Sequence, residues 1–234
     1  MLFRSAVTDD RFDGRMRYRS GADFFWRPST NFQLTATVHP DFGAVESDDV
    51  VINLTATETF FPEKRLFFLE GQEIFVTSPR ADTRSSGVGN TGAPTTLINT
   101  RRIGGQPIEP ELAAGYRISD REASQPVPLV GAVKLTGQAG RFRYGFLTAF
   151  EDDFKFDAEF NGDPIHLEGA PSDYGVARIL YEDSPGGAYR AVGMISTAAL
   201  NDQRDAMTHG IDAHYLGENG KLKVDGQLYM SDIE

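Results

Sequence analysis

The chain has 234 residues, no cysteine and a formal net charge of −11 at pH 7. The absence of cysteine excludes a disulfide scaffold and any site built on thiolates. The acidic balance argues against nucleic acid as a partner, because a phosphate backbone requires a basic surface.

The first part of the chain alternates apolar with charged or polar residues, which is the period of a β-strand. Residues 15–27 place four large apolar side chains on one face and three arginines on the other: Met16, Tyr18, Phe24 and Trp26 against Arg15, Arg17 and Arg19. After a turn at residues 28–31, the segments 32–38 and 50–57 repeat the alternation. Arginines in succession along one strand face favour a water-filled interior over the dry core of a sandwich.

The stretch from residue 32 to residue 75 combines dense charge with dense aromatic content. Its acidic connection holds Asp41, Glu46, Asp48 and Asp49, and the run FFPEKRLFFLEG at residues 60–71 places Glu63, Lys64, Arg65 and Glu70 among four phenylalanines. Opposite charges so close to phenylalanines indicate enclosed ions that must pair, because an unpaired buried charge costs several kcal/mol.

The segment around Pro62 breaks the alternation that its neighbours keep. Proline cannot donate a ladder hydrogen bond. We therefore expect the chain to leave the wall formed by the strands there and to turn toward the interior. Glu63 or Glu70 is then expected to meet Arg65, Lys64 or a wall arginine. The wall candidates are Arg17, Arg19, Arg101 and Arg102.

The sequence HPDFGAVESDDVVINLTATETFFPEKRLFFLEGQEIF at residues 39–75 resembles the core motif of a bacterial family, the domain of unknown function 5916 (DUF5916). Weaker similarity continues at residues 101–104 and 129–140, so we expect the resemblance to extend over the whole chain. The resemblance implies a C-terminal β-barrel of outer-membrane type, usually preceded by a carbohydrate-binding domain similar to family 9. It carries over no catalytic residues. It implies outer-membrane lipid as a partner, glycans reached through an upstream domain, and a location in the bacterial outer membrane.

The middle of the chain is less regular. Residues 77–96 are predicted to form a long exposed loop, residues 97–103 a strand, and residues 104–128 an irregular return, so the span 76–128 is loop-rich. From residue 129 the alternation resumes, at residues 129–139, 142–151, 174–182, 189–200, 211–215 and 222–230. Short turns at 28–31, 139–141, 184–188 and 217–220 alternate with longer links at 40–49, 152–173 and 201–206, a pattern typical of a meandering transmembrane barrel.

The predicted fold is therefore all-β, an antiparallel meander of outer-membrane β-barrel type, with residues 1–234 as a single domain. Roughly nine or ten strands follow from the period-two pattern, so we expect an incomplete piece of a larger barrel. Residues 1–12 lack the pattern of a signal peptide, and a signal for export is expected upstream of this chain.

Three alternatives stay open for the function. The first is a non-enzymatic barrel domain that anchors a carbohydrate-binding module or conducts glycans. The second is a carbohydrate-active hydrolase with its acid and base among Glu63, Glu70 and Asp41, and the third is a soluble β-sandwich binding module. No cofactor is expected. Asp41, Glu46, Asp48 and Asp49 can in principle ligate Ca²⁺, but they lack the spacing of a calcium loop, and pairing with the arginines is favoured.

Overall fold

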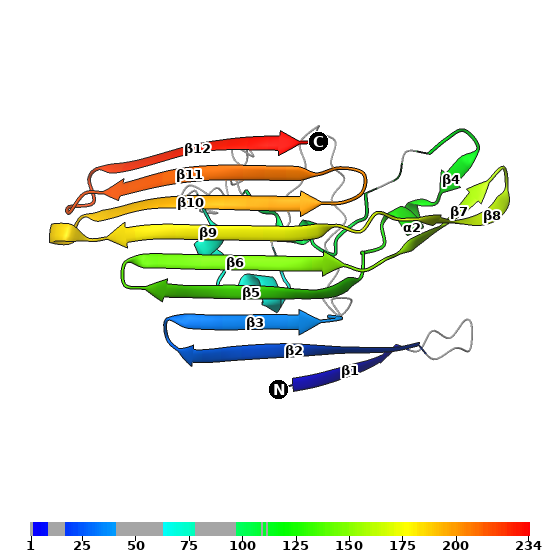
Figure 1. Ribbon diagram of the computed structural model, residues 1–234, viewed down its shortest axis with the longest axis horizontal. Coiled ribbons are helices and arrows are strands. Elements are labelled where there is room, and N and C mark those ends of the chain that lie inside the picture. Colours follow the sequence, from blue (N-terminus) through cyan, green and yellow to red (C-terminus); the bar gives the residue numbers. More distant parts are fainter. Residues whose placement is uncertain (1, 9–16, 41–62, 78–96, 109, 111) are drawn as a thin grey trace.

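The computed structural model describes residues 2–8, 17–40, 63–77, 97–108, 110 and 112–234, with the backbone alone for residues 2–8, 17–19 and 121. Nine strands form one antiparallel sheet in the order β1-β2-β3-β5-β6-β9-β10-β11-β12 (Figure 1). Their bounds are β1 Leu2–Thr8, β2 Arg17–Ser29, β3 Phe32–Val38, β5 Leu129–Ala139, β6 Phe142–Glu151, β9 Asp173–Asp183, β10 Tyr189–Leu200, β11 Ala206–Leu216 and β12 Lys223–Ile233.

The sheet is a meander because strands that follow one another along the chain also pair. Tight turns join β2 to β3, β5 to β6, β9 to β10 and β11 to β12, and all four lie at one end of the sheet, which we call the hairpin end (Figure 1). The turn after β9 contains a short 3₁₀ helix, η4 Pro185–Gly187, in which Gly186 and Gly187 adopt positive φ. The predicted turns at residues 28–31, 139–141, 184–188 and 217–220 all fall at this end.

The two faces of the sheet differ in chemistry. Opposed side chains form a row on one face that runs across eight strands, from Trp26 through Leu34, Leu135, Phe146, Ala177, Ser196 and His209 to Met230. The opposite face carries Thr35, Lys134, Leu147, Val176, Arg178, Ile195 and Asp212, all of them buried. We call the first the outer face and the second the inner face. Successive residues such as Leu34 and Thr35, or Leu135 and Lys134, lie on opposite faces, as the period of two requires.

Two segments cover the inner face. The first, residues 63–77, contains α1 Leu66–Leu69 and η1 Gln72–Phe75, and we call it the inner segment. The second, residues 97–105, contains η3 Thr100–Arg102, and we call it the inner turn. Phe68, Ile74, Phe75 and Ile103 from these segments form one buried cluster with side chains of β5, β6, β9 and β10. In Figure 1 the inner segment, coloured cyan, lies behind the sheet.

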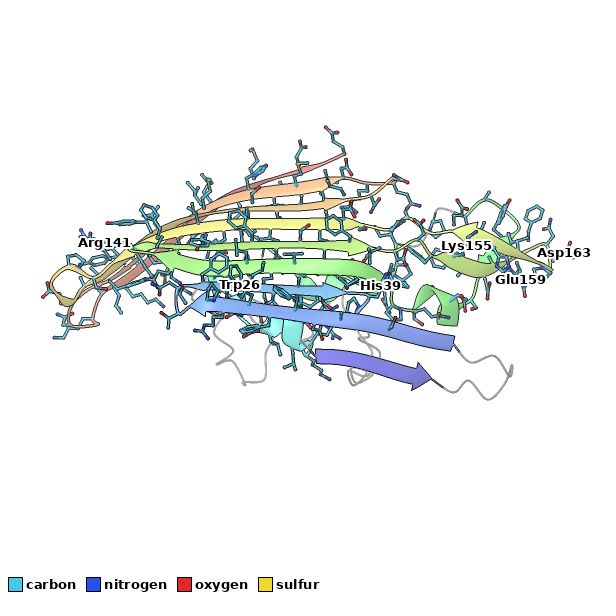
Figure 2. The ribbon with its side chains drawn as sticks, turned by 60° about the horizontal axis from the view of Figure 1, so that its bottom comes forward. Trp26, His39, Arg141, Lys155, Glu159 and Asp163 are labelled. Carbon is cyan, nitrogen blue, oxygen red and sulfur yellow. The ribbon has the colours of Figure 1, made fainter. Side chains whose placement is uncertain are left out.

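A second sheet extends beyond the end of the main sheet that is opposite the hairpin end (Figure 1). Its strands are β4 Tyr116–Ile118, β7 Lys155–Phe160 and β8 Asp163–Glu168, in the order β4-β7-β8, and α2 Asp120–Ala123 lies next to it. Figure 2 shows Lys155, Glu159 and Asp163 on this projection and Arg141 at the hairpin end. Tyr116 and Phe160 pack together across β4 and β7, with ring centroids 4.6 Å apart.

Several local predictions were wrong. Residues 97–103 form the inner turn with a 3₁₀ helix, because Asn99 caps it through its side chain and Ile103 turns into the core. Residues 152–173 contain the β7–β8 hairpin, and residues 104–128 contain β4 and α2. These elements are short, so their period is hard to read from sequence. The predicted strand at residues 50–57 lies outside the described residues.

The all-β antiparallel prediction is confirmed. Among the described residues the main sheet is open, with β1 at one edge and β12 at the other, as expected for an incomplete piece of a barrel. No helix within the described ranges has the length and apolar character needed to cross a membrane.

Candidate functional site

An ion pair between Glu63 and Arg65 joins the inner segment to the inner turn. Arg65 Nη2 lies 2.8 Å from Glu63 Oε2, and Arg65 Nε lies 2.9 Å from Glu63 Oε1. The same guanidinium donates to the backbone oxygens of Thr100 and Ile103, and the hydroxyl of Thr100 donates to Glu63 Oε2 at 2.7 Å. The Glu63 side chain is 2% exposed, so both charges are satisfied within the protein.

The protonation of Glu63 follows from these contacts. Burial raises the pKa of Glu63, but the hydrogen bonds and positive charge of Arg65, together with the hydroxyl of Thr100, outweigh burial and hold the pKa below its ordinary value of 4.5. The carboxylate also accepts the backbone N–H groups of Lys64 and Arg65, at 3.0 and 2.9 Å. A carboxylate held by this many fixed donors acts as a structural anion and is poorly suited to proton transfer.

Lys134 attaches β5 to the inner segment. Its side chain is buried on the inner face, and Nζ donates to the backbone oxygens of Phe67 and Glu70. These carbonyls lie in and just after α1, where main-chain oxygens lack partners within the helix. The ammonium group also lies 5.0 Å from the centre of the Phe67 ring. Lys134 therefore caps α1 and holds it against the inner face of the sheet.

A second ionic network begins at Arg178 on β9. Its guanidinium makes a bidentate pair with Asp212 on β11, with Nη2 2.7 Å from Oδ2, and its Nε donates to the backbone oxygen of Ile74 at 3.2 Å. Both side chains of the pair are 1% exposed. Because the two Nη atoms make the bidentate pair, Nε is available to the inner segment. Arg178 therefore connects η1 to β9 and β11.

The network continues from Asp212 toward the edge of the sheet. His214 Nε2 lies 2.7 Å from Asp212 Oδ2, and its Nδ1 lies 2.9 Å from Asp225 Oδ1 on β12. Lys223 Nζ follows at 3.6 Å from Asp225 Oδ2. Both ring nitrogens of His214 thus face carboxylates. The result is a continuous line of charged and polar side chains across three strands.

Smaller polar contacts surround this line. Arg143 on β6 lies 3.5 Å from Glu73 of the inner segment and 4.0 Å from Glu182 on β9. The Tyr189 hydroxyl donates to Glu182 at 3.1 Å. At the other end of β6, the Glu151 carboxylate accepts the backbone N–H groups of Gly104 and Ser172, at 3.0 and 2.8 Å. Strand β6 thus contacts both the inner segment, through Glu73, and the inner turn, through Gly104.

The residues predicted for the charge network have different locations. Glu63 and Arg65 pair directly, Lys64 is exposed beside them, and Glu70 ends α1, where its backbone oxygen accepts from Lys134. Arg101 and Arg102 lie in η3 of the inner turn, so they are not wall residues. Arg17 and Arg19 lie on β2, where the backbone alone is described. The weak metal candidates Asp41, Glu46, Asp48 and Asp49 lie outside the described residues, and the part of the chain that the structure describes contains no group of three or more His, Asp or Glu arranged for a metal ion.

The alternation at residues 129–139, 174–182 and 211–215 puts Lys134, Arg178 and Asp212 on the polar sides of their strands, but it does not connect them. Gly193 on β10 pairs with Asp212 on β11, whereas Arg178 on β9 pairs with Ile195, so the guanidinium reaches Asp212 diagonally across β10. A Cβ on Gly193 would lie 2.6 Å from the Arg178 guanidinium, so the glycine leaves room for this crossing. A glycine on the inner face, directly opposite a carboxylate on one adjacent strand and diagonal to an arginine on the other, is the available signal. It becomes legible only when the strand register is known.

The sequence matches one known family over much of this architecture. None of the curated proteins and none of the solved structures matches the chain. The model of one family, described as "Domain of unknown function (DUF5916)", matches residues 3–159, which include the inner segment, the inner turn and strands β2 to β6. The chain therefore belongs to the DUF5916 family.

Proposed function

We propose that the nine-stranded sheet is part of the wall of a β-barrel in the bacterial outer membrane. The domain either anchors a module that binds surface carbohydrates or conducts glycans during their uptake. The observation that carries the proposal is the apolar outer face, which no other described element covers. Large side chains stand exposed along it, including Val192 and Met194 at 60% and Leu228 and Met230 at 69%. Soluble monomers rarely expose contiguous apolar patches above roughly a few hundred Å².

Aromatic pairs at the hairpin end support a membrane boundary there. On the outer face, Trp26 packs against Phe32 with ring centroids 5.6 Å apart, and Phe142 packs against Tyr181 at 5.2 Å. Beyond them lie charged side chains such as Arg141 (Figure 2). Girdles of aromatic residues border the apolar band of membrane barrels, and this order of apolar, aromatic and charged positions fits one such border.

The main polar exceptions on the outer face are paired. Ser196 and His209 lie opposite each other on β10 and β11, and Ser196 Oγ is 2.8 Å from His209 Nδ1. The hydroxyl of Thr148 donates to the backbone oxygen of Tyr174 at 3.0 Å. Polar groups that bond to each other or to the backbone cost less in hydrocarbon than unpaired ones, so these residues are compatible with a lipid-facing wall.

The other candidate functions have less support. A soluble sandwich requires a second sheet over one face of the first, whereas the described three-stranded sheet extends past the end of the main sheet (Figure 1). A hydrolase with Glu63 as acid or base requires a carboxyl group that reaches a substrate, and both oxygens of Glu63 are held by protein donors. The carbohydrate part of the proposal rests on the carbohydrate-binding domain that the family resemblance implies upstream.

Membrane fractionation tests the location. In a bacterium with two membranes, we expect the full-length protein to sediment with the outer membrane and to stay there through alkaline extraction, because a lipid-facing wall is held by the hydrophobic effect. A protein that is released into detergent-free buffer as a monodisperse monomer would contradict the proposal.

The single tryptophan of the chain reports which face meets lipid. For the full-length protein in vesicles, with any tryptophan outside this chain replaced by phenylalanine, we expect brominated lipids to quench the fluorescence of Trp26, which is half exposed on the outer face. The double substitution Trp26→Phe with Phe25→Trp moves the indole to the opposite face of the same strand, and is expected to remove this quenching. Equal quenching of both proteins by aqueous iodide, with none by brominated lipid, would refute the assignment.

A further inference from the structure

We infer that the inner segment and the inner turn form a fixed plug that closes the barrel, so that the domain serves as an anchor and not as an open conduit. This inference rests on the proposed function, because a plug requires a barrel. Main-chain contacts, packing and the depth of the filling each support the plug.

The first step is that the wall binds the backbone of the inner segment. Lys134 from β5 donates to the oxygens of Phe67 and Glu70, and Arg178 from β9 donates to the oxygen of Ile74. Among the described residues, Lys134 makes no ion pair with a carboxylate. If the segment left the wall, this buried cation would lose both of its carbonyl partners, so departure is opposed by the cost of an unsatisfied charge.

The second step is that the wall is shaped to receive the segment. Phe68, Ile74 and Phe75 are almost fully buried in one cluster with Leu147, Val176, Leu180 and Ile195 of the inner face. The sheet has a glycine where Ile74 and Phe75 lie against it. A Cβ on Gly145 of β6 would lie 2.8 Å from Ile74 Cγ2 and 3.0 Å from the Phe75 ring.

The third step is that the filling is more than one chain deep. The inner turn is bound to the inner segment through Arg65, whose guanidinium donates to the backbone oxygens of Thr100 and Ile103. Strands in a sheet lie about 4.8 Å apart, so the five strands from β5 to β11 that line this region span roughly 20 Å. Two layers of chain are therefore held against a strip of the sheet of this width, on the face that a solute would have to pass.

Planar-bilayer conductance tests the plug. We expect the full-length, membrane-inserted protein to show no stable conductance, and the variant Gly145→Val to open channels at least about tenfold more often, because the new side chain displaces Ile74 and Phe75. The matched control is Gly175→Val on the outer face of β9, where a Cβ meets nothing within 4 Å; it is expected to stay silent. A second variant, Lys134→Met, removes the donors to α1 with little change in volume and is expected to open the channel as well.

Two further readouts separate the possible failures. Flotation with vesicles reports insertion, and cleavage after the buried Arg65 by an arginine-specific protease, which ignores the exposed Lys64, reports release of the inner segment. Failure to float refutes the proposed function on which the inference depends. A wild-type protein that floats and conducts steadily, or variants that float and release the segment yet stay silent, would overturn the plug while leaving the barrel in place.

Discussion

At the scale of single residues, the charges of the inner face are expensive unless they are paired. The Glu63–Arg65 pair and the Arg178–Asp212 pair are both removed from water, so their Coulomb attraction mainly offsets the cost of desolvation. Their partners include backbone oxygens of the inner segment and inner turn, and these contacts give the pairs a role in positioning the chain. Breaking one partner should therefore cost more than replacing both.

A double-mutant cycle on Glu63 and Arg65 tests this. We expect Glu63→Gln or Arg65→Met alone to lower the free energy of unfolding by about 3–5 kcal/mol, since each leaves an unpaired buried charge. The double variant should lose less than the sum of the two. Urea unfolding of the protein in lipid vesicles gives the values, and Glu168→Gln in the exposed Lys155–Glu168 pair is the control, with no measurable change expected. A coupling energy near zero would show that the pairing of Glu63 with Arg65 does not stabilise the fold.

The pH dependence of the same carboxylate has a definite sign. Because the folded-state pKa of Glu63 is lowered, its contribution to stability is present above the ordinary value of 4.5 and is lost as the pH falls through the folded pKa. The difference in unfolding free energy between the wild type and Glu63→Gln should be constant from pH 7 to about pH 5, then shrink in more acidic solution. A difference that grows as the pH falls from 4.5 would mean that the sign is wrong.

At the scale of elements, successive residues of each strand alternate between the outer face and the inner face of the sheet. Leu34 and Gln33 are neighbours on β3 at nearly the same depth but on opposite faces. We expect Leu34→Arg to destabilise the membrane-inserted protein by about 1–2 kcal/mol, because an arginine on the lipid face costs roughly 2–4 kcal/mol at the midplane and less toward a boundary such as the one beside Trp26. Gln33→Arg should have a much smaller effect. The measurement is urea unfolding in vesicles, and equal effects of the two substitutions would contradict the assignment of the faces.

The strands and their faces could be predicted from the sequence because alternation is a local signal. The main strands after residue 129 and the turns that join them follow directly from it. The direction of the segment after Pro62 was also predictable, from the missing N–H of the proline and the interrupted period. The partners of Arg178 and Lys134 were not, because pairing across strands depends on register, and their acceptors include main-chain oxygens from segments more than sixty residues away. Nothing local in the sequence encodes such contacts.

At the scale of the whole molecule, the open sheet leaves β1 and β12 each with one paired side among the described residues. Unpaired backbone groups cost several kcal/mol each in hydrocarbon, so a wall in a bilayer must close. We therefore expect these 234 residues alone to form no closed, heat-resistant monomer in detergent. Gel migration with and without boiling, compared with the full-length protein, checks this. A heat-modifiable monomer formed by the chain alone would contradict it.

The central claim is that the outer face meets lipid and the inner face does not. The chain has no cysteine, so single cysteines on β12 can carry nitroxide labels without background. In the full-length protein in lipid vesicles, with any cysteine outside this chain replaced by serine, labels at Leu228 and Met230 on the outer face should be accessible to oxygen, and labels at Gln227 and Tyr229 should be accessible to an aqueous nickel complex. That alternation with period two is the predicted result; all four labels open to the nickel complex, or outer labels shielded from both reagents, would contradict the account.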